Sequence, residues 1–179
     1  MRKMEFFDEY HLLYKNIIMS NGMTLHHQER DWTCSLACIR TIVSSIFDDW
    51  LSEDELVEKY NMKPSPYFSK DIKEMGILKE FDTSFGCDSI EKDFNDLIGL
   101  LNNGYKIMIE SMYGYSHWLV LLGYIPINNA DIEKSQLLLF DPYYNQVRLV
   151  IVDEFISMWK DGNYEETKVE MDYIAIRNK

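Results

Sequence analysis

Apolar residues in the first half of the chain recur at the spacing of an α-helix. Between residues 34 and 47 they stand three or four positions apart, which places them on one face of a helix. They are Leu36, Ile39, Ile42, Val43 and Ile46. Asp31 and Thr33 come just before this segment and are candidate N-cap residues. The pattern therefore predicts a helix over residues 34–47.

Three more helices are expected after the first one, at residues 52–60, 66–75 and 88–102. Ser52 and Glu55 have the spacing of a capping box, in which each side chain bonds the other residue's backbone N–H. Asp88 and Glu91 have the same spacing and are expected to open the third of these helices. Gly76 is a helix stop, because glycine adopts the left-handed conformation that often ends a helix.

The second half of the chain shows the pattern of strands. Apolar runs of strand length lie at residues 105–112, 117–124, 137–141, 146–152 and 172–177, and a short helix is expected at 153–160. Turn residues at 114–116 and 142–145 favour antiparallel pairing of the strands they join. Helices first and antiparallel strands second predict an α+β fold. We expect a single domain over residues 1–179, with a helical part at about 1–104 and a strand-rich part at about 105–179.

The charge balance excludes some classes of partner. The chain carries 18 basic and 30 acidic residues, a net charge of −12, and its Lys and Arg residues do not cluster. Such a surface repels phosphate backbones and anionic lipid, so neither nucleic acid nor a membrane is an expected partner. The sequence has no glycine-rich phosphate loop, and no cofactor is expected.

The chain is expected to reside in the cytoplasm. Its N-terminal apolar stretches are broken by charged residues, unlike a signal peptide, and no apolar run has the roughly 18–20 residues of a membrane helix. Three cysteines, an odd number, do not form a disulfide framework, which favours a reducing compartment. Export without a cleaved signal peptide stays open, and so does the oligomeric state.

Cys34 stands where a loop enters the first predicted helix. The N-terminus of a helix carries a partial positive charge that favours thiolate over thiol, and the thiolate is the nucleophile. Taken alone, a cysteine at a helix start is more often structural. Cys38, one turn further along the same face, is expected to be a small buried residue. A zinc site with His26 and His27 is disfavoured, because the cysteines do not form a Cys-x2-Cys pair and no second pair exists, so no metal is expected.

His117 and Asp141 each stand at the end of an apolar strand. His117 opens one strand directly after a turn, and Asp141 closes the next strand directly before Pro142. Consecutive strands tend to pair, which would bring the acid to a ring nitrogen of the histidine. The plain alternatives are an inert histidine at a strand end and an Asp-Pro turn.

The three residues say more together than each does alone. A thiolate that attacks an acyl carbon needs a base, an acid that orients the base, and a donor for the oxyanion that forms. Cys34 suits the part of the thiolate, His117 that of the base, and Asp141 that of the acid that orients the base. Gln28, six residues before Cys34 on the loop into the helix, is a candidate for the donor.

These motifs resemble the papain-like cysteine peptidase superfamily. The nearest resemblance is to the branch of bacteriocin-processing peptidases, which cleave double-glycine leaders, and to its stand-alone relatives. Matching stretches run from about residue 23 to residue 177: Gln28-x5-Cys34 with Ala37-Cys38, the strand 117–124 after His117, Asp141-Pro142, and Phe155 with Trp159. The chain departs from the family in having Thr33-Cys34-Ser35 where Asp-Cys-Gly is usual, and in a longer connection at 125–136.

The resemblance implies a papain-like fold whose N-terminal helical half carries the nucleophile helix and packs on a C-terminal antiparallel sheet. It also implies the roles: Cys34 the nucleophile, His117 the base, Asp141 the residue that orients the base, and Gln28 the oxyanion donor. The activity expected is cleavage of a peptide or amide bond in a peptide or protein substrate, through a thioester. Glutamine deamidation, transpeptidation or other acyl transfer on the same triad stay open, as does a catalytically silent binding module.

Overall fold

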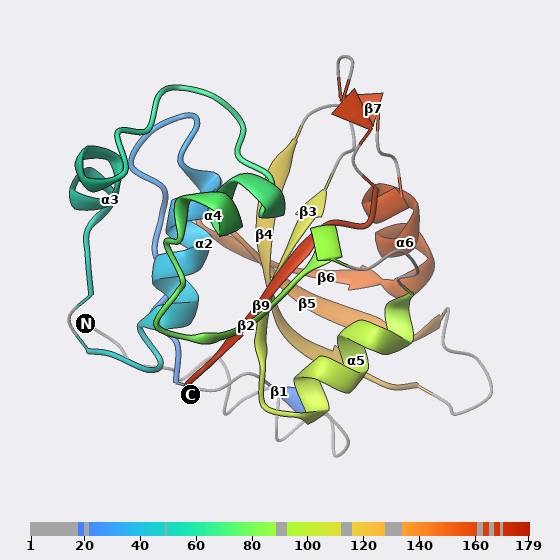
Figure 1. The fold of residues 1–179 in the computed structure, drawn as a ribbon. Helices are drawn as coiled ribbons and strands as arrows, with labels where there is room; N and C mark the ends of the chain where they lie inside the picture. The colour runs from blue at the N-terminus through green and yellow to red at the C-terminus, as the bar shows by residue number, and fades with distance from the viewer. Residues whose placement is uncertain are drawn as a thin grey trace.

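The computed structural model describes residues 18–19, 22–48, 50–88, 93–111, 116–127, 134–160, 163–164, 167–168 and 170–179. Helices cover both faces of a central antiparallel sheet (Figure 1). Within these ranges no helix is long and apolar enough to cross a membrane. The assignment of residues 1–179 to one domain stays a prediction.

Seven of the described strands form the central sheet. Its order is β2 (Asp82–Phe85), β9 (Tyr173–Arg177), β3 (Lys106–Ser111), β4 (His117–Ile125), β5 (Gln136–Asp141) and β6 (Gln146–Ile151), and β1 (Ile18–Met19) also pairs with β4. Every pairing is antiparallel. Two short strands, β7 (Asn163–Tyr164) and β8 (Thr167–Lys168), pair separately. All nine residues of β4 are buried, because β4 lies inside the sheet and both of its faces are covered.

The helices lie in two layers (Figure 1). On one side of the sheet are α2 (Cys34–Val43), α3 (Glu53–Lys59) and α4 (Ser69–Met75), and on the other are α5 (Phe94–Asn102) and α6 (Val152–Lys160). Alternate strand residues serve the two layers, as period-2 side-chain alternation requires. On β9, Ile174 and Ile176 join the core with α2, whereas Tyr173 and Ala175 join the core with α5 and α6. The sheet is therefore the shared wall of two hydrophobic cores.

The helix at Cys34 begins at the predicted residue but ends earlier than predicted, at Val43. The hydroxyl of Ser44 donates to the carbonyl of Thr41 at 2.7 Å, and that of Ser45 donates to the carbonyl of Ile42 at 2.6 Å. Serine hydroxyls that capture backbone carbonyls compete with the helical ladder. Ile46, expected on the helix, instead packs against the core from the following turn.

Of the other predicted helix boundaries, the start of α3 and the end of α4 agree with the structure, whereas the start of α4, at Ser69 rather than residue 66, and the cap at Asp88 do not. Ser52 and Glu55 form the capping box of α3, and Gly76 ends α4 at a φ of 69°. The predicted cap at Asp88 is wrong, because Asp88 belongs to a short 3-10 helix at Gly86–Asp88. Asp93 caps α5 instead: its Oδ1 accepts from Asp96 N at 3.0 Å, and Asp96 Oδ2 accepts from Asp93 N at 2.9 Å.

The strands of the second half match the predicted ranges to within two residues at each end. The turn expected at 114–116 falls mostly outside the described residues, whereas the turn after Asp141 is present, with Asn145 in the left-handed region at a φ of 51°. Strand β2 was not predicted and departs from the rule of helices first. It pairs with β9, and its register places Phe85 opposite Ile174.

Candidate active site

Cys34 is the first residue of α2 and is partly exposed. The loop before it is fastened by Thr33, whose hydroxyl accepts from Arg30 N at 3.1 Å and donates to Arg30 O at 3.0 Å. Thr33 makes no side-chain cap to the helix, so its hydroxyl serves the loop rather than the helix. The thiol therefore lies at a helix N-terminus, where backbone N–H groups favour a negative charge.

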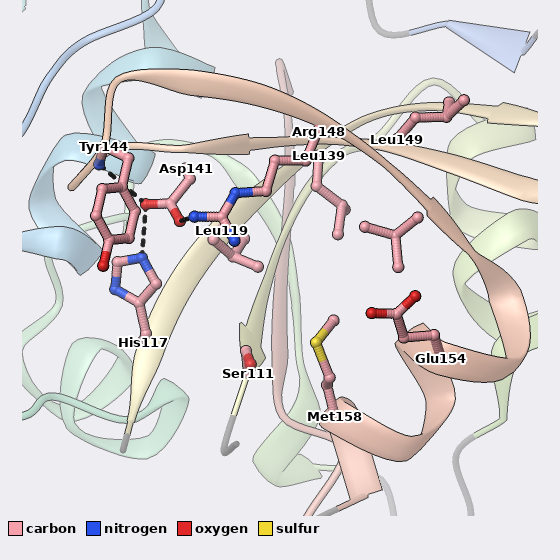
Figure 2. Close-up of a pocket in the computed structure, with 11 residues that line it drawn as sticks. Ser111, His117, Leu119, Leu139, Asp141, Tyr144, Arg148, Leu149, Glu154 and Met158 are labelled. Atoms are coloured by element: carbon pink, nitrogen blue, oxygen red, sulfur yellow. Dashed lines mark hydrogen bonds and ion pairs between the residues drawn. The ribbon is translucent and has the colours of Figure 1, made fainter. Parts of the chain in front are cut away.

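His117 and Asp141 meet where two neighbouring strands of the sheet, β4 and β5, have adjacent ends. His117 is the first residue of β4 and Asp141 the last residue of β5, and neighbouring antiparallel strands bring such ends together. His117 Nε2 bonds Asp141 Oδ1 at 2.8 Å, as Figure 2 shows. Only 8% of His117 and 3% of Asp141 is exposed, so the pair is shielded from water. The contact between His117 and Asp141 that the sequence predicts is present in the structure.

His117 also contacts Cys34. Burial lowers the pKa of His117, but hydrogen bonds and charge interactions with Asp141 and with Cys34 outweigh burial and raise that pKa to about 9. Because Nε2 is held by Asp141, Nδ1 is the ring nitrogen left for the thiol. The three side chains thus form a chain of contacts in which the imidazole of His117 lies between the thiol of Cys34 and the carboxylate of Asp141.

Asp141 accepts more hydrogen bonds than the predicted one. Its Oδ1 also accepts from the backbone N–H groups of Tyr143 at 3.0 Å and Tyr144 at 3.3 Å, and its Oδ2 pairs with Arg148 Nη2 at 2.8 Å. Burial acts to raise the pKa of Asp141, but the bond to His117 and the nearby charges of His117 and Arg148 lower it on balance. The carboxyl is therefore held in its ionised form.

Gln28 is buried next to the turn that follows Asp141. Its backbone N–H donates to Pro142 O at 3.0 Å, and its side-chain Nε2 donates to Arg30 O at 2.7 Å. Only 5% of the residue is exposed, and its Oε1 has no hydrogen-bond partner among the described residues. One N–H of the amide is thus used by the loop, and the second remains for another acceptor.

A cleft of about 690 Å³ opens over Cys34 and His117. One wall comes from the loops before α2 and before α4, and the other from the start of β4 and the turn after β5. The lining residues are Asp31, Trp32, Cys34, Pro64, Ser65, Pro66, Ser116, His117, Tyr143 and Tyr144. Cys34 and His117 thus line one and the same cleft.

A second hollow, of about 450 Å³, lies behind the His117–Asp141 pair. Figure 2 shows Arg148 reaching from β6 across it to Asp141, with Glu154 and Met158 of α6 on its far side. Its other walls are apolar and include Leu119, Leu139 and Leu149. The pair is thus flanked by the cleft on one side and by this hollow on the other.

Two buried acids near the site were not singled out in the sequence. Glu110 on β3 is fully buried, and the hydroxyl of Ser116, the residue before His117, donates to its Oε1. Burial is the main cause that raises the pKa of Glu110 to about 9, so it is neutral near neutral pH. Glu53, at the start of α3, accepts from Glu29 N at 3.1 Å and so supports the loop before Cys34. Glu110 could have been found in the sequence, because it is an acidic residue within an otherwise apolar strand segment.

The other cysteines and histidines that the structure describes do not line the cleft. Cys38 is fully buried, as predicted, and burial raises the pKa of its thiol. Cys87 is exposed. His27 Nε2 bonds Tyr143 O at 3.0 Å, which ties the loop before Gln28 to the turn after Asp141. Among the residues that the structure describes, no three His, Cys, Asp or Glu side chains are placed to hold a metal ion together.

No protein-family model matches the sequence, and no curated protein matches it. Among solved structures, the peptidase domain of Streptococcus ComA is similar, with a TM-score of 0.59. ComA is a bi-functional ABC transporter involved in a quorum sensing pathway. The match covers 89% of this chain and 100% of that domain. The fold is papain-like. The predicted papain-like fold, with the helix that begins at Cys34 packed on an antiparallel sheet, is confirmed; at 18% identity the likeness shows the architecture alone.

Proposed function

We propose that this chain is a cysteine-dependent enzyme that cleaves a peptide or amide bond through a thioester intermediate. One observation carries the proposal: a single imidazole, that of His117, is bonded to Asp141 at 2.8 Å and also contacts Cys34 at the start of α2. A nucleophile, a base and an orienting acid in one line are the parts that this chemistry needs. The papain-like fold supports the same reading at the level of architecture.

In the first step, the thiolate of Cys34 attacks the carbonyl carbon of the substrate. A bond forms between Sγ and carbon while the carbonyl π pair moves to oxygen, which becomes an oxyanion. The second N–H of Gln28 and the backbone N–H groups at the start of α2 are the candidate donors to that oxygen. The oxyanion then reforms the carbonyl and expels the amine, which takes the proton from His117.

In the second step, water attacks the thioester. His117, now neutral, takes a proton from the water, the carboxylic acid leaves, and the electron pair of the broken bond returns to Sγ. Asp141 stays ionised and keeps the imidazole in place throughout. An amine in place of water would give transpeptidation, and a glutamine side chain as substrate would give deamidation. An assay must therefore detect all three classes of product.

A direct test of the nucleophile needs no substrate. Iodoacetamide is added to the folded protein near neutral pH, and labelled cysteines are mapped by peptide mass. Cys34 is expected to label first, whereas buried Cys38 reacts only after unfolding. Cys87→Ala is the matched control, because it removes the exposed thiol and leaves the site intact. Labelling of Cys87 at least as fast as Cys34 in the wild type would contradict the proposal.

The substrate class is found by comparing proteomes. Cell lysate is incubated with the wild type and, in parallel, with Cys34→Ala. New peptide termini indicate peptidase activity, Gln-to-Glu mass shifts indicate deamidation, and new peptide junctions indicate transpeptidation. If Cys34 labels selectively yet none of the three products appears in any lysate, the scaffold is better explained as a binding module.

A further inference from the structure

Arg148 lies on the oxygen of Asp141 that His117 does not use. Oδ1 of the carboxyl faces His117 Nε2, and Oδ2 pairs with Arg148 Nη2, both at 2.8 Å (Figure 2). The arginine comes from β6 and the histidine from β4, on either side of β5. The two bonds therefore fix the rotation of the carboxyl group from opposite sides.

The turn that follows Asp141 adds further contacts around the ion pair of Asp141 and Arg148. The guanidinium of Arg148 lies over the ring of Tyr144 at 5.1 Å, and the backbone N–H of Tyr144 donates to Asp141 Oδ1 at 3.3 Å. Arg148 opposes Leu139 across the β5–β6 ladder, so strand register sets its position. Because strand register and the Tyr144 ring already restrict the Arg148 side chain, that side chain loses little conformational freedom when it pairs with Asp141.

We propose that Arg148 is a positioning residue of this site, which holds the Asp141 carboxylate ionised and turned so that Oδ1 faces His117. This inference rests on the proposed function of Cys34 and His117. Arg148 does not touch the reacting atoms; it acts through Asp141. None of the motifs quoted for the papain-like resemblance includes it.

Charge neutrality explains why the arginine matters. In the ionised site, the charges of Cys34 and Asp141 are negative and those of His117 and Arg148 are positive, so the four groups sum to zero. Without Arg148 a largely buried set would carry a net negative charge, which low-dielectric surroundings disfavour. The site would then take up a proton at a higher pH than it does with the arginine in place.

The groups that face Asp141 set the sign of this effect. They are His117 from β4, Arg148 from β6 and, beyond them, Cys34 from α2 and Glu154 from α6 across the hollow. Arg148 contributes to the low pKa of Asp141, so its loss raises that pKa. The acid side of the activity profile should move to higher pH.

The test follows the rate of Cys34 alkylation by iodoacetamide as a function of pH in the full chain. Arg148→Gln removes the charge, and Arg148→Lys keeps the charge but lacks the planar fork. We expect the Gln variant to alkylate about three- to tenfold more slowly near neutral pH, with the acid limb about one pH unit higher. The Lys variant should keep the wild-type acid limb and lose less rate.

Arg177→Gln is the matched control. Arg177 also pairs with an aspartate, Asp82, at 2.6 Å, and also lies over a tyrosine ring, that of Tyr105 at 4.4 Å. Its side chain is 43% exposed, against 48% for Arg148, and it lies on β9, which β3, β4 and β5 separate from β6 in the sheet order. This variant should change neither the rate nor the acid limb.

Each outcome decides one way. A wild-type acid limb and rate in folded Arg148→Gln, checked by thermal melting, would overturn the proposal. An acid limb in Arg148→Lys that shifts although the charge is kept would overturn it as well. If the Gln variant does not fold, Arg148→Met, which also removes the charge but keeps the apolar stem, takes its place in the same measurement. If Cys34 is unreactive in the wild type, the proposed function fails first, and that result is separate from a reactive Cys34 that is indifferent to Arg148.

Discussion

The two halves of the candidate site are built by different means. Cys34 is placed by local structure, since it opens a helix and the loop before it is fastened within three residues by Thr33 and Arg30. His117 and Asp141 are placed by strand register and are held by charged side chains from three neighbouring strands. The helix side therefore depends on backbone geometry and the sheet side on electrostatics. Substitutions should affect the two sides differently.

The largest effect on activity is expected on the helix side. Cys34→Ala should reduce turnover to the background level, because no thioester forms without the thiol. Its melting temperature should stay close to wild type, since the side chain is partly exposed and the helix does not depend on it. Turnover on an identified substrate measures the loss of activity, and thermal melting measures the stability. Wild-type turnover in folded Cys34→Ala would rule out the cysteine as nucleophile.

Gln28→Ala tests whether the loop contributes to chemistry. One oxyanion donor is typically worth on the order of 10²–10³ in turnover, and we expect a loss of that size. Iodoacetamide labelling of Cys34, which forms no oxyanion, should change much less. The two measurements together separate a lost donor from a collapsed loop, because a collapsed loop would slow the labelling to a similar degree.

Asp141→Asn tests the sheet side. The amide can accept from one neighbour but cannot serve both His117 and Arg148 as a charged acceptor. Loss of charged hydrogen bonds at a buried position is expected to cost about 1–3 kcal/mol of unfolding free energy. Chemical denaturation measures the change. If Asp141→Asn were as stable as Cys34→Ala, the contrast between the two halves would not hold.

The pH dependence of stability tests the charge network. The pKa of His117 is raised from 6.5 to about 9, so its contribution to stability is fully present below the unfolded value and is lost as pH rises through the folded value. We expect unfolding free energy to fall over that window by an amount on the order of 1–3 kcal/mol. Denaturation at a series of pH values measures it. Cys34→Ala should show a smaller fall, because the thiol is one of the groups that raise this pKa.

The smallest effect on activity is expected at the cap of α3. Ser52→Ala removes the side chain that accepts from Glu55 N at 3.2 Å, which should cost roughly 0.5–2 kcal/mol of unfolding free energy. Turnover should stay within a factor of about two, since changes remote from the site and its partners usually act independently of it. A larger loss of turnover would mean that Glu53, beside this cap, couples α3 to the loop before Cys34.

The contrast also explains which parts of the site were visible in the sequence. Cys34 at a helix start, His117 at a strand start and Asp141 before Pro142 each follow from local pattern, and the structure brings the three together. Arg148 was missed, because an arginine on a half-exposed edge strand has the pattern of a solvated charge. Its meaning depends on the register between β5 and β6, which local pattern does not give.

The fold was predictable to a similar degree. Strong apolar runs gave β3, β4 and β5, whereas β2 was missed because its four residues are mostly polar and its partner, β9, comes almost at the end of the chain. Two capping patterns stand close together at Asp88 and Asp93. Packing selects the second, since it begins the helix where Phe94, Leu97 and Leu101 can reach the core.

Cys34, His117 and Asp141 are far apart along the chain, and this separation affects the order in which the site forms during synthesis and folding. Cys34 belongs to the first layer to be synthesised, but His117 and Asp141 arrive on strands much later in the sequence. Long-range strand pairing forms slowly compared with a helix, because loop closure must come first. A nascent chain would thus carry Cys34 without the imidazole that is proposed to activate it. On the proposed function, reactivity of the thiol would appear only once β4 has paired with β5, after most of the chain has been made.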